Sequence, residues 1–266
     1  MKYLLAFLFF LCSNVYSKTG SYLLYDYELG TSQVAHNINE VRPIASITKL
    51  FTAITILRSG EDLNEKVKVQ GKSNGRFPRG TKIARIDLMR AMLISSDNLA
   101  AETLANTYPG GFKKYLQDVN RYARGMGFIN TKLADSTGLS RDNVSTAKEL
   151  VVFLSKIQSN QIIRDIANER QDSIAVPKGK KTLIIKLHNT NPSLFVFDNI
   201  LISKTGFTNP AGRCVVMLVE KGDKLYGIAI LGQKNVRDRS EIAKELIQLE
   251  ALELPTPEPI EFVFPI

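Results

Sequence analysis

Strand-like segments at both ends of the chain, with a helical stretch between them, place the strongest constraint on the fold. Residues 21–28 and 33–36 are rich in β-formers and are separated by a turn at Gly30. Helical patterns dominate residues 46–124, whereas residues 182–231 are mostly apolar and β-branched. This order predicts an α+β fold, in which an antiparallel sheet with flanking helices carries a helical lobe. A cleft between the sheet and the lobe would be a natural position for a binding site.

Local signals set the expected boundaries of these elements. An apolar stretch that ends before Gly60 predicts a buried helix. Thr146 and Glu149 form a predicted capping box at the start of another helix, and Gly222-Asp223 predicts a hairpin turn. The expected helices cover residues 46–57, 87–94, 99–106 and 112–124, a segment from about residue 145 and a closing segment at 239–252. The expected strands after residue 173 are 182–187, 200–203, 212–220 and 224–231.

The first 17 residues have the composition of a signal peptide. Lys2 is followed by an apolar run at residues 3–12 and a polar segment at residues 13–17, which matches the basic, hydrophobic and cleavage regions of such peptides. The run is too short for a permanent transmembrane anchor. We therefore expect an exported protein with a signal peptide at residues 1–17, one folded domain at 18–254 and a C-terminal tail at 255–266.

The charge balance bears on the kind of partner. The chain has 35 Lys and Arg against 26 Asp and Glu, a formal net charge of +9. Apart from a cluster at Lys178, Lys180 and Lys181 the basic residues are interpreted as dispersed, and no nucleic-acid-binding motif is present. We therefore expect no nucleic-acid partner. For an exported basic protein a carboxylate-rich polymer or a membrane surface is more suitable, and a solvated basic surface without a partner is the alternative.

Only one cysteine would remain after export. Cys12 falls in the predicted signal peptide, so Cys214 is alone in the remainder of the chain. An intramolecular disulfide is therefore excluded in that form. The apolar neighbours of Cys214 predict a small buried side chain and not a catalytic thiol.

Three short motifs follow one another along the chain: Ser46-Ile-Thr-Lys49, Ser96-Asp-Asn98 and Lys204-Thr-Gly206. In this order they are the parts of an acyltransferase that activates a serine with a lysine. Two of them have second copies, at residues 145–148 and 18–20. The first copy caps an amphipathic helix that offers no apolar surroundings to a lysine, and the second lies on no predicted strand. We therefore assign no chemistry to either copy.

The spacing of Ser46 and Lys49 places both side chains on one face at the start of the predicted helix. Burial in this apolar helix would lower the pKa of Lys49 from its usual ~10.4, so that its amine could accept the Ser46 proton. The helix N-terminus would add a backbone N–H and a positive dipole end beside a developing oxyanion.

The second motif lies between two helical segments and is expected to form a loop tip. There the Ser96 hydroxyl could relay a proton between lysine and leaving group. The Asn98 amide could hold a substrate carbonyl.

The third motif ends an apolar strand whose edge could pair with an extended peptide. Lys204 and Thr205 offer electrostatic and hydroxyl contacts to a terminal carboxylate. Gly206 permits a close approach of the backbone, and the N–H of Phe207 could complete an oxyanion hole.

Taken with their flanks, these motifs resemble those of the penicilloyl-serine transferases, which comprise penicillin-binding proteins and serine β-lactamases. The flanks are most similar to low-molecular-mass D-alanyl-D-alanine peptidases, in particular the endopeptidase branch of the penicillin-binding protein 7 type. The segments that carry the resemblance are Arg42–Leu50, Tyr108–Gly111, Ser136–Ser140, Asn143–Thr146, His188–Asn191, Lys204–Asn209 and Ala211–Cys214. It extends from about residue 21 to 252 and implies the transpeptidase-like fold of penicillin-binding proteins and serine β-lactamases.

The resemblance implies a periplasmic serine D,D-peptidase that cleaves D-Ala-containing bonds in the stem peptides of peptidoglycan. It implies that Ser46 is acylated, that Lys49 is its base and that Ser96 relays a proton. The substrate-binding residues that it implies are Asn98, Lys204, Thr205, Gly206, Phe207 and Thr208. β-Lactams would be covalent inhibitors, and neither a metal nor a cofactor is implied. Whether the enzyme is an endopeptidase or a carboxypeptidase stays open, with Phe207 favouring the endopeptidase.

Three alternatives or departures accompany this assignment. A class A β-lactamase needs a glutamate that positions water, yet residues 103–148 contain no glutamate and Glu149 is assigned to a capping box. A non-catalytic penicillin- or wall-binding module is the second alternative, although every reactive residue is present. Carboxypeptidase relatives carry a further β-rich domain and a C-terminal anchor, whereas only about 60 residues follow Lys204. We therefore expect a single domain without a stable membrane anchor.

Overall fold

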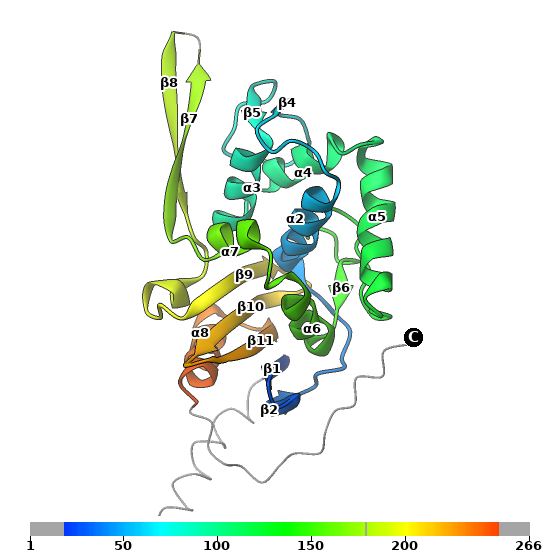
Figure 1. The fold of residues 1–266 in the computed structure, drawn as a ribbon, viewed down its shortest axis with the longest axis vertical. Helices are drawn as coiled ribbons and strands as arrows, with labels where there is room; N and C mark the ends of the chain where they lie inside the picture. The colour runs from blue at the N-terminus through cyan, green and yellow to red at the C-terminus, as the bar shows by residue number, and fades with distance from the viewer. Residues whose placement is uncertain (1–18, 179, 250–266) are drawn as a thin grey trace, which may run out of the picture.

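One five-stranded antiparallel sheet unites the two ends of the chain (Figure 1). The structure is a computed structural model that describes residues 19–178 and 180–249, so the predicted signal peptide and C-terminal tail lie outside the described residues. The sheet has the order β2-β1-β11-β10-β9. Its strands are β1 (Ser21–Asp26), β2 (Thr31–His36), β9 (Ile200–Thr208), β10 (Gly212–Lys221) and β11 (Lys224–Gln233). The predicted antiparallel sheet, with both of its expected hairpins, is confirmed.

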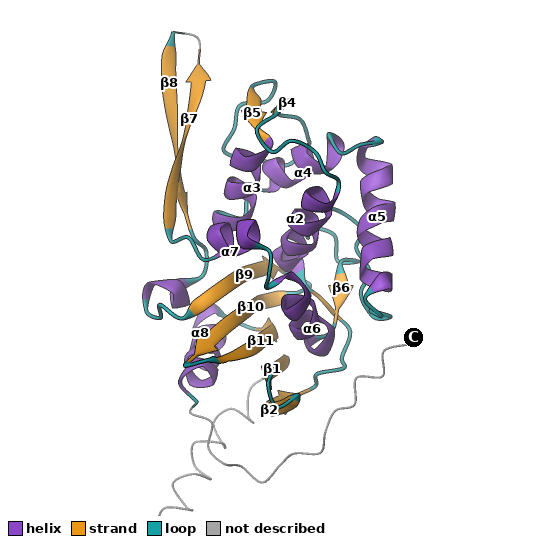
Figure 2. Cartoon of the chain, in the orientation of Figure 1, coloured by secondary structure: helices purple, strands orange, loops and turns teal. Residues whose placement is uncertain are grey.

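Both faces of this sheet are buried, because alternate side chains of each strand point to opposite faces. In β1, Leu23 belongs to one apolar cluster and Leu24 to another. Helix α8 (Val236–Gln248) covers the Leu24 face, whereas α6 (Ala147–Ile157) and the helical lobe cover the other face. Figure 2 shows these helices on either side of the sheet.

Helix α2 (Thr48–Arg58) is the central element of the helical lobe. It is buried from Thr48 to Ile56, as its apolar sequence predicts, and Phe51 stacks on Phe153 of α6 with ring centroids 3.8 Å apart. The surrounding helices of the lobe are α3 (Arg85–Ile94), α4 (Asn98–Asn106) and α5 (Gly111–Gly125). This burial extends to the first turn of α2, where Lys49, the lysine of the first motif, is located.

Two elements differ from the sequence-based expectation. Helix α7 (Gln161–Ala167) was not expected; it is capped by Asn160, whose side chain accepts a hydrogen bond from the Ile163 N–H. Strand β7 (Gln171–Lys178) pairs with β8 (Lys181–His188) in a hairpin that extends away from the sheet (Figure 1). Only β8 was expected as a strand, and β7 was missed. The proline near the end of β7 is tolerated because this strand pairs on one side only, with β8.

Capping accounts for two further boundaries. Helix α8 begins three residues before its expected start because Asn235 accepts a hydrogen bond from the Asp238 N–H at 2.8 Å. Thr146 caps α6 as predicted, accepting from the Glu149 N–H at 3.1 Å. The Glu149 carboxylate does not complete the expected box, since it accepts instead from Asn130 and Thr131.

Short elements complete the described chain. They are β3 (Arg42–Pro43), the 3₁₀ turn η1 (Ala45–Ile47), β4 (Lys66–Lys68), β5 (Lys82–Ala84), β6 (Val144–Ser145) and the 3₁₀ turn η2 (Pro192–Phe195). Within residues 19–178 and 180–249, no helix combines the length and apolar character that crossing a membrane requires.

Candidate active site

The first motif forms a hydrogen-bonded pair at the start of α2. Ser46 is partly exposed in the turn η1, and Lys49 is fully buried in the first turn of the helix. Lys49 Nζ lies 2.8 Å from Ser46 Oγ, 2.8 Å from Asn98 Oδ1 and 2.6 Å from the carbonyl oxygen of Thr137. The structure therefore brings together Ser46, Lys49 and Asn98 as the sequence predicts, and adds Thr137.

These three contacts orient the lysine amine for proton transfer. The oxygens of Asn98 and Thr137 can only accept hydrogen bonds, whereas the Ser46 hydroxyl can also donate. A neutral amine has two N–H bonds and one lone pair. If both N–H bonds are used by the two pure acceptors, the lone pair faces Ser46 Oγ. The geometry thus selects the serine as the proton donor.

Burial also makes the neutral amine accessible near neutral pH. Desolvation lowers the pKa of Lys49 to about 7, although the negative charges of Asp135, Asp97 and Glu102 oppose this shift. A lysine with a pKa near the working pH can both take and return a proton. The apolar helix in which it is buried therefore gives Lys49 the property that its predicted role as base requires.

Unusual backbone geometry marks the same place. Among the described residues other than glycine, three have a positive φ, and two of these are Ala45 (φ 47°) and Ser96 (φ 56°). Such conformations are costly and cluster at functional sites. Ala45 directly precedes Ser46, the predicted nucleophile, and Ser96 is the predicted relay. No hydrogen bond joins the partly exposed Ser96 hydroxyl to another described residue, so its role as relay stays a prediction.

The edge of β9 lies against the backbone of Ser46. A Cβ atom added at Gly206 would be 2.9 Å from the Ser46 nitrogen and 2.9 Å from the Ile44 carbonyl oxygen. The lack of a side chain at Gly206 thus allows this strand edge to pack against the Ser46 backbone, whereas its predicted contact with substrate stays a prediction. Thr205 Oγ1 lies 2.6 Å from Thr190 Oγ1, which fixes the third motif beside the segment that follows β8.

Lys204 belongs to a group of cations beneath this strand edge. Its buried amine donates to the Thr205 carbonyl oxygen at 3.1 Å, and burial, with repulsion from Lys49 and Arg239, lowers its pKa well below the usual range. Arg239 of α8 is buried, and its pKa is lowered by burial and by Arg213. Neither arginine forms an ion pair with a carboxylate of the described residues. Because no carboxylate of the described residues offsets this repulsion, a bound anion such as a carboxylate would favour the protonated form of Lys204.

The exposed end of β9 carries the remaining predicted residues. The Arg213 guanidinium lies 3.6 Å from the centre of the Phe207 ring, which is 45% exposed. The Thr208 hydroxyl accepts a hydrogen bond from the Ala211 N–H and so stabilises the turn into β10. An oxyanion-hole role for the Phe207 N–H stays a prediction.

A loop that the sequence did not identify as functional supports the lysine. The Asp135 carboxylate accepts hydrogen bonds from the backbone N–H groups of Thr137, Gly138 and Ser140 at 2.6–2.7 Å. This arrangement fixes the carbonyl of Thr137, which contacts Lys49 across 88 positions of sequence. Such a long-range contact leaves no local pattern, so Asp135 and Thr137 were missed as parts of the site. Arg213 and Arg239 were missed for the same reason, because only the fold brings them near the third motif.

We expect Asp135→Asn to shift the pH dependence of Ser46 acylation toward lower pH. The Asp135 charge raises the pKa of Lys49, so its removal favours the neutral, proton-accepting amine. Acylation rates with a β-lactam from pH 5 to 9 would reveal the shift of the acid limb. Asp142→Asn, in an exposed position of the same loop, is the matched control and should leave the profile unchanged. An unchanged profile in both variants would contradict the role of Asp135.

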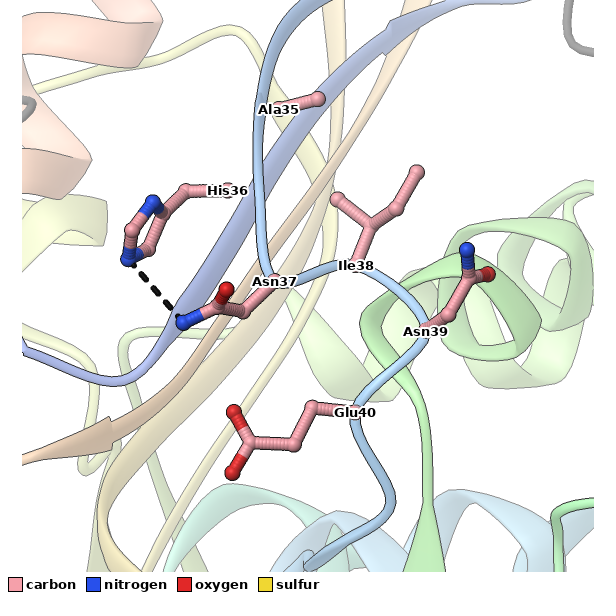
Figure 3. A pocket seen from close by; sticks show the side chains of 6 residues that line it. All are labelled: Ala35, His36, Asn37, Ile38, Asn39 and Glu40. Carbon is pink, nitrogen blue, oxygen red and sulfur yellow. Dashed lines mark hydrogen bonds between the residues drawn. The ribbon is translucent and has the colours of Figure 1, made fainter.

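Features outside this site carry none of its chemistry. An open hollow of about 600 Å³ beside β2 is lined by residues 35–40 (Figure 3). It lies at the edge of the sheet opposite β9, so we place the site at Ser46 on the basis of the reactive groups.

In the second copy of the first motif, Ser145 Oγ is buried 2.7 Å from Thr131 Oγ1, which fits the predicted structural role. Cys214 is buried as predicted, and burial raises its pKa to about 11.

The fold and the serine–lysine pair together define a serine acyltransferase with a D,D-transpeptidase fold. A crystal structure of a DD-transpeptidase from Streptomyces matches with a TM-score of 0.80 and 22% identity, covering 87% of this chain and 95% of that one. Penicillin-binding protein D2 from Listeria monocytogenes, in its ampicillin-bound form, matches with a TM-score of 0.76 and 27% identity over 86% of this chain and 95% of that one.

The sequence comparisons give the family. A family model described as D-alanyl-D-alanine carboxypeptidase, Peptidase S11, matches residues 12–235, and the chain belongs to this family. A D-alanyl-D-alanine endopeptidase of Escherichia coli is 35% identical over 223 residues, which are 80% of this chain and 71% of the relative. A D-alanyl-D-alanine endopeptidase of Pseudomonas aeruginosa is 36% identical over 75% of this chain and 66% of the relative. The predicted family and fold are thereby confirmed.

Proposed function

We propose that this protein is a periplasmic D-alanyl-D-alanine endopeptidase that opens peptidoglycan cross-links through an acyl-enzyme on Ser46. The observation that carries the proposal is the buried amine of Lys49, which lies within hydrogen-bond distance of Ser46 Oγ, Asn98 Oδ1 and the Thr137 carbonyl oxygen. Family membership supports a serine D-Ala-D-Ala peptidase. The endopeptidase relatives support the choice of bond, and the signal-peptide pattern supports the location.

The geometry suggests a sequence of proton transfers. Ser46 Oγ attacks the carbonyl carbon of D-alanine while its proton passes to Lys49 Nζ. When the peptide C–N bond breaks, the proton is delivered to the leaving amine, for which Ser96 is the proposed relay. Water then attacks the ester, and the proton that it loses returns to Ser46 Oγ as the acid is released. Lys204 and Arg239 would attract a carboxylate of the substrate toward the strand edge.

The surroundings of the glutamates favour a peptidase over a β-lactamase. The Glu149 carboxylate is bound by Asn130 and Thr131, and the Glu102 carboxylate by the backbone N–H groups of Lys72 and Ser73. Residues 103–148 supply no other glutamate. Without a carboxylate that positions water, a β-lactam ester on Ser46 should persist.

A fluorescent penicillin tests the acyl-enzyme directly. The wild-type protein should retain the label after denaturing electrophoresis, whereas Ser46→Ala should retain none. Ser145→Ala, which alters the equivalent serine of the second motif copy, is the matched control and should label like the wild type. Absence of label on the wild-type protein would refute the enzymatic assignment, and rapid loss of label would indicate a β-lactamase.

Digestion of cross-linked sacculi tests the choice of bond. Mass spectrometry of the muropeptides should show conversion of dimers to monomers if the protein is an endopeptidase. Shortening of pentapeptides by one D-alanine without loss of dimers would identify a carboxypeptidase and overturn the finer assignment.

A further inference from the structure

A segment at the end of the helical lobe concentrates the positive charge of this chain. Residues 66–82 contain no Asp or Glu and six cationic residues, against a net charge of +9 for the whole chain. All six are exposed: Lys66, Lys68, Lys72, Arg76, Arg79 and Lys82. We call residues 66–82 the basic ribbon. The expectation that the basic residues outside the cluster near Lys180 are dispersed is therefore wrong.

The charge of the basic ribbon is not neutralised within the described protein. None of its six cations forms an ion pair with a described carboxylate. Glu65, the acid next to it in sequence, is paired with the buried Arg85. Arg79 donates to the carbonyl oxygens of residues 71–73, which shapes the loop and leaves its charge in place. A surface of this kind attracts a polyanion.

The basic ribbon is attached directly to the second catalytic motif. The Arg76 N–H donates to the Asp97 carboxylate at 2.7 Å, and Asp97 also caps α4. A Cβ atom added at Gly75 would lie 2.6 Å from Asp97 Oδ1. The backbone of Lys72 is held by Glu102, one turn along α4 from Asn98. The ribbon is therefore fixed to the start of α4, the helix that carries Asn98.

The side chains of the ribbon distinguish among polyanions. Its large apolar residues are buried, Phe77 at 3% exposure and Ile83 beyond its end at 4%, and none of the exposed large hydrophobic residues of the described chain lies within it. It therefore lacks the apolar face with which a helix or loop enters a membrane surface. It also lacks exposed aromatic rings on which nucleic-acid bases could stack.

We propose that the basic ribbon binds carboxylates of the peptidoglycan strand and holds the polymer next to the active site. The proposal rests on the proposed function, since it assumes that the anionic polymer is the substrate. The surface contributes polymer binding and not chemistry, so it should affect sacculi and leave small substrates unaffected.

Co-sedimentation with purified sacculi tests the proposal, with the full exported protein and its Ser46→Ala variant to separate binding from turnover. A triple variant with Lys66→Glu, Lys68→Glu and Lys82→Glu should have an affinity for sacculi about tenfold lower at low salt. The matched control combines Lys132→Glu, Lys234→Glu and Lys244→Glu, exposed positions on other elements, and should bind like the wild type. Both triple variants, with Ser46 retained, should label with fluorescent penicillin at the wild-type rate, which shows that they are folded.

Two further arms identify the anion. Binding of the wild-type protein should fall as NaCl is raised, and should be lost on sacculi whose carboxylates have been amidated. Equal binding by the ribbon and control variants, or tighter binding to anionic lipid vesicles than to sacculi, would overturn the proposal. Failure of the proposed function would appear separately, as absence of penicillin labelling or of muropeptide cleavage in the wild-type protein.

Discussion

Replacing Lys49 with methionine is expected to lower the rate of Ser46 acylation by about 10²–10⁴-fold, the usual contribution of a positioned base. Methionine has a similar length and tolerates the buried environment. It cannot accept the Ser46 proton. The loss of two hydrogen bonds, to Asn98 and Thr137, should cost about 1–3 kcal/mol of stability. A time course of labelling with a fluorescent penicillin measures the acylation rate, and thermal unfolding measures the loss of stability.

The second copy of the motif supplies the control for this variant. Lys148→Met makes the same chemical change three residues after Ser145, and should leave acylation at the wild-type rate. Acylation by Lys49→Met at more than a tenth of the wild-type rate would show that another group serves as base.

The pH dependence of the wild-type protein follows from the same lysine. Because burial lowers its pKa to about 7, the proton-accepting form increases as the pH rises through 7. Acylation should therefore rise from pH 5 and level off above about pH 8. A rate that continues to rise with the pKa of an ordinary lysine, ~10.4, would contradict the desolvated state of Lys49.

Local sequence patterns predicted the reactive pair because their chemistry depends on a short spacing. Ser46 and Lys49 are three residues apart on one helix, and the apolar character of that helix alone indicates a buried amine. Asn98 could be placed in the site through its motif, but its contact with Lys49 could not. That contact depends on how α4 packs against α2, and the packing of two helices leaves no local pattern in a single sequence.

The unpredicted parts of the site share this long-range origin. Thr137 contributes a backbone carbonyl, which no side-chain motif reports, and Asp135 acts through the loop that carries it. Arg239 acts on Lys204 electrostatically, from a helix on the far face of the sheet. In the fold, the same limit applies to β7, which was not expected as a strand and whose only partner in the sheet is β8.

Gly138→Ala is expected to be the most disruptive substitution in the loop behind the nucleophile. Gly138 has φ +85°, and a Cβ atom there would lie 1.9 Å from the Ala45 carbonyl oxygen and 2.8 Å from the Ser46 nitrogen. Backbone strain and overpacking together should cost about 2–5 kcal/mol of stability. Relief of the clash would also displace Ser46, so acylation of any folded protein should fall. Thermal unfolding and penicillin labelling measure both.

Gly125→Ala is the matched control for this prediction. Gly125 ends α5 with no neighbouring atom within 4 Å of an added Cβ and without a positive φ. Alanine should therefore be tolerated there or stabilise the helix by about 0.5–1 kcal/mol. If Gly138→Ala melted and acylated like Gly125→Ala, the Asp135 loop would not be packed against the Ser46 backbone as the structure has it. The opposite result would show that the position of the nucleophile depends on a contact between segments about 90 residues apart, which is why this loop belongs to the active site although it contributes no reactive side chain.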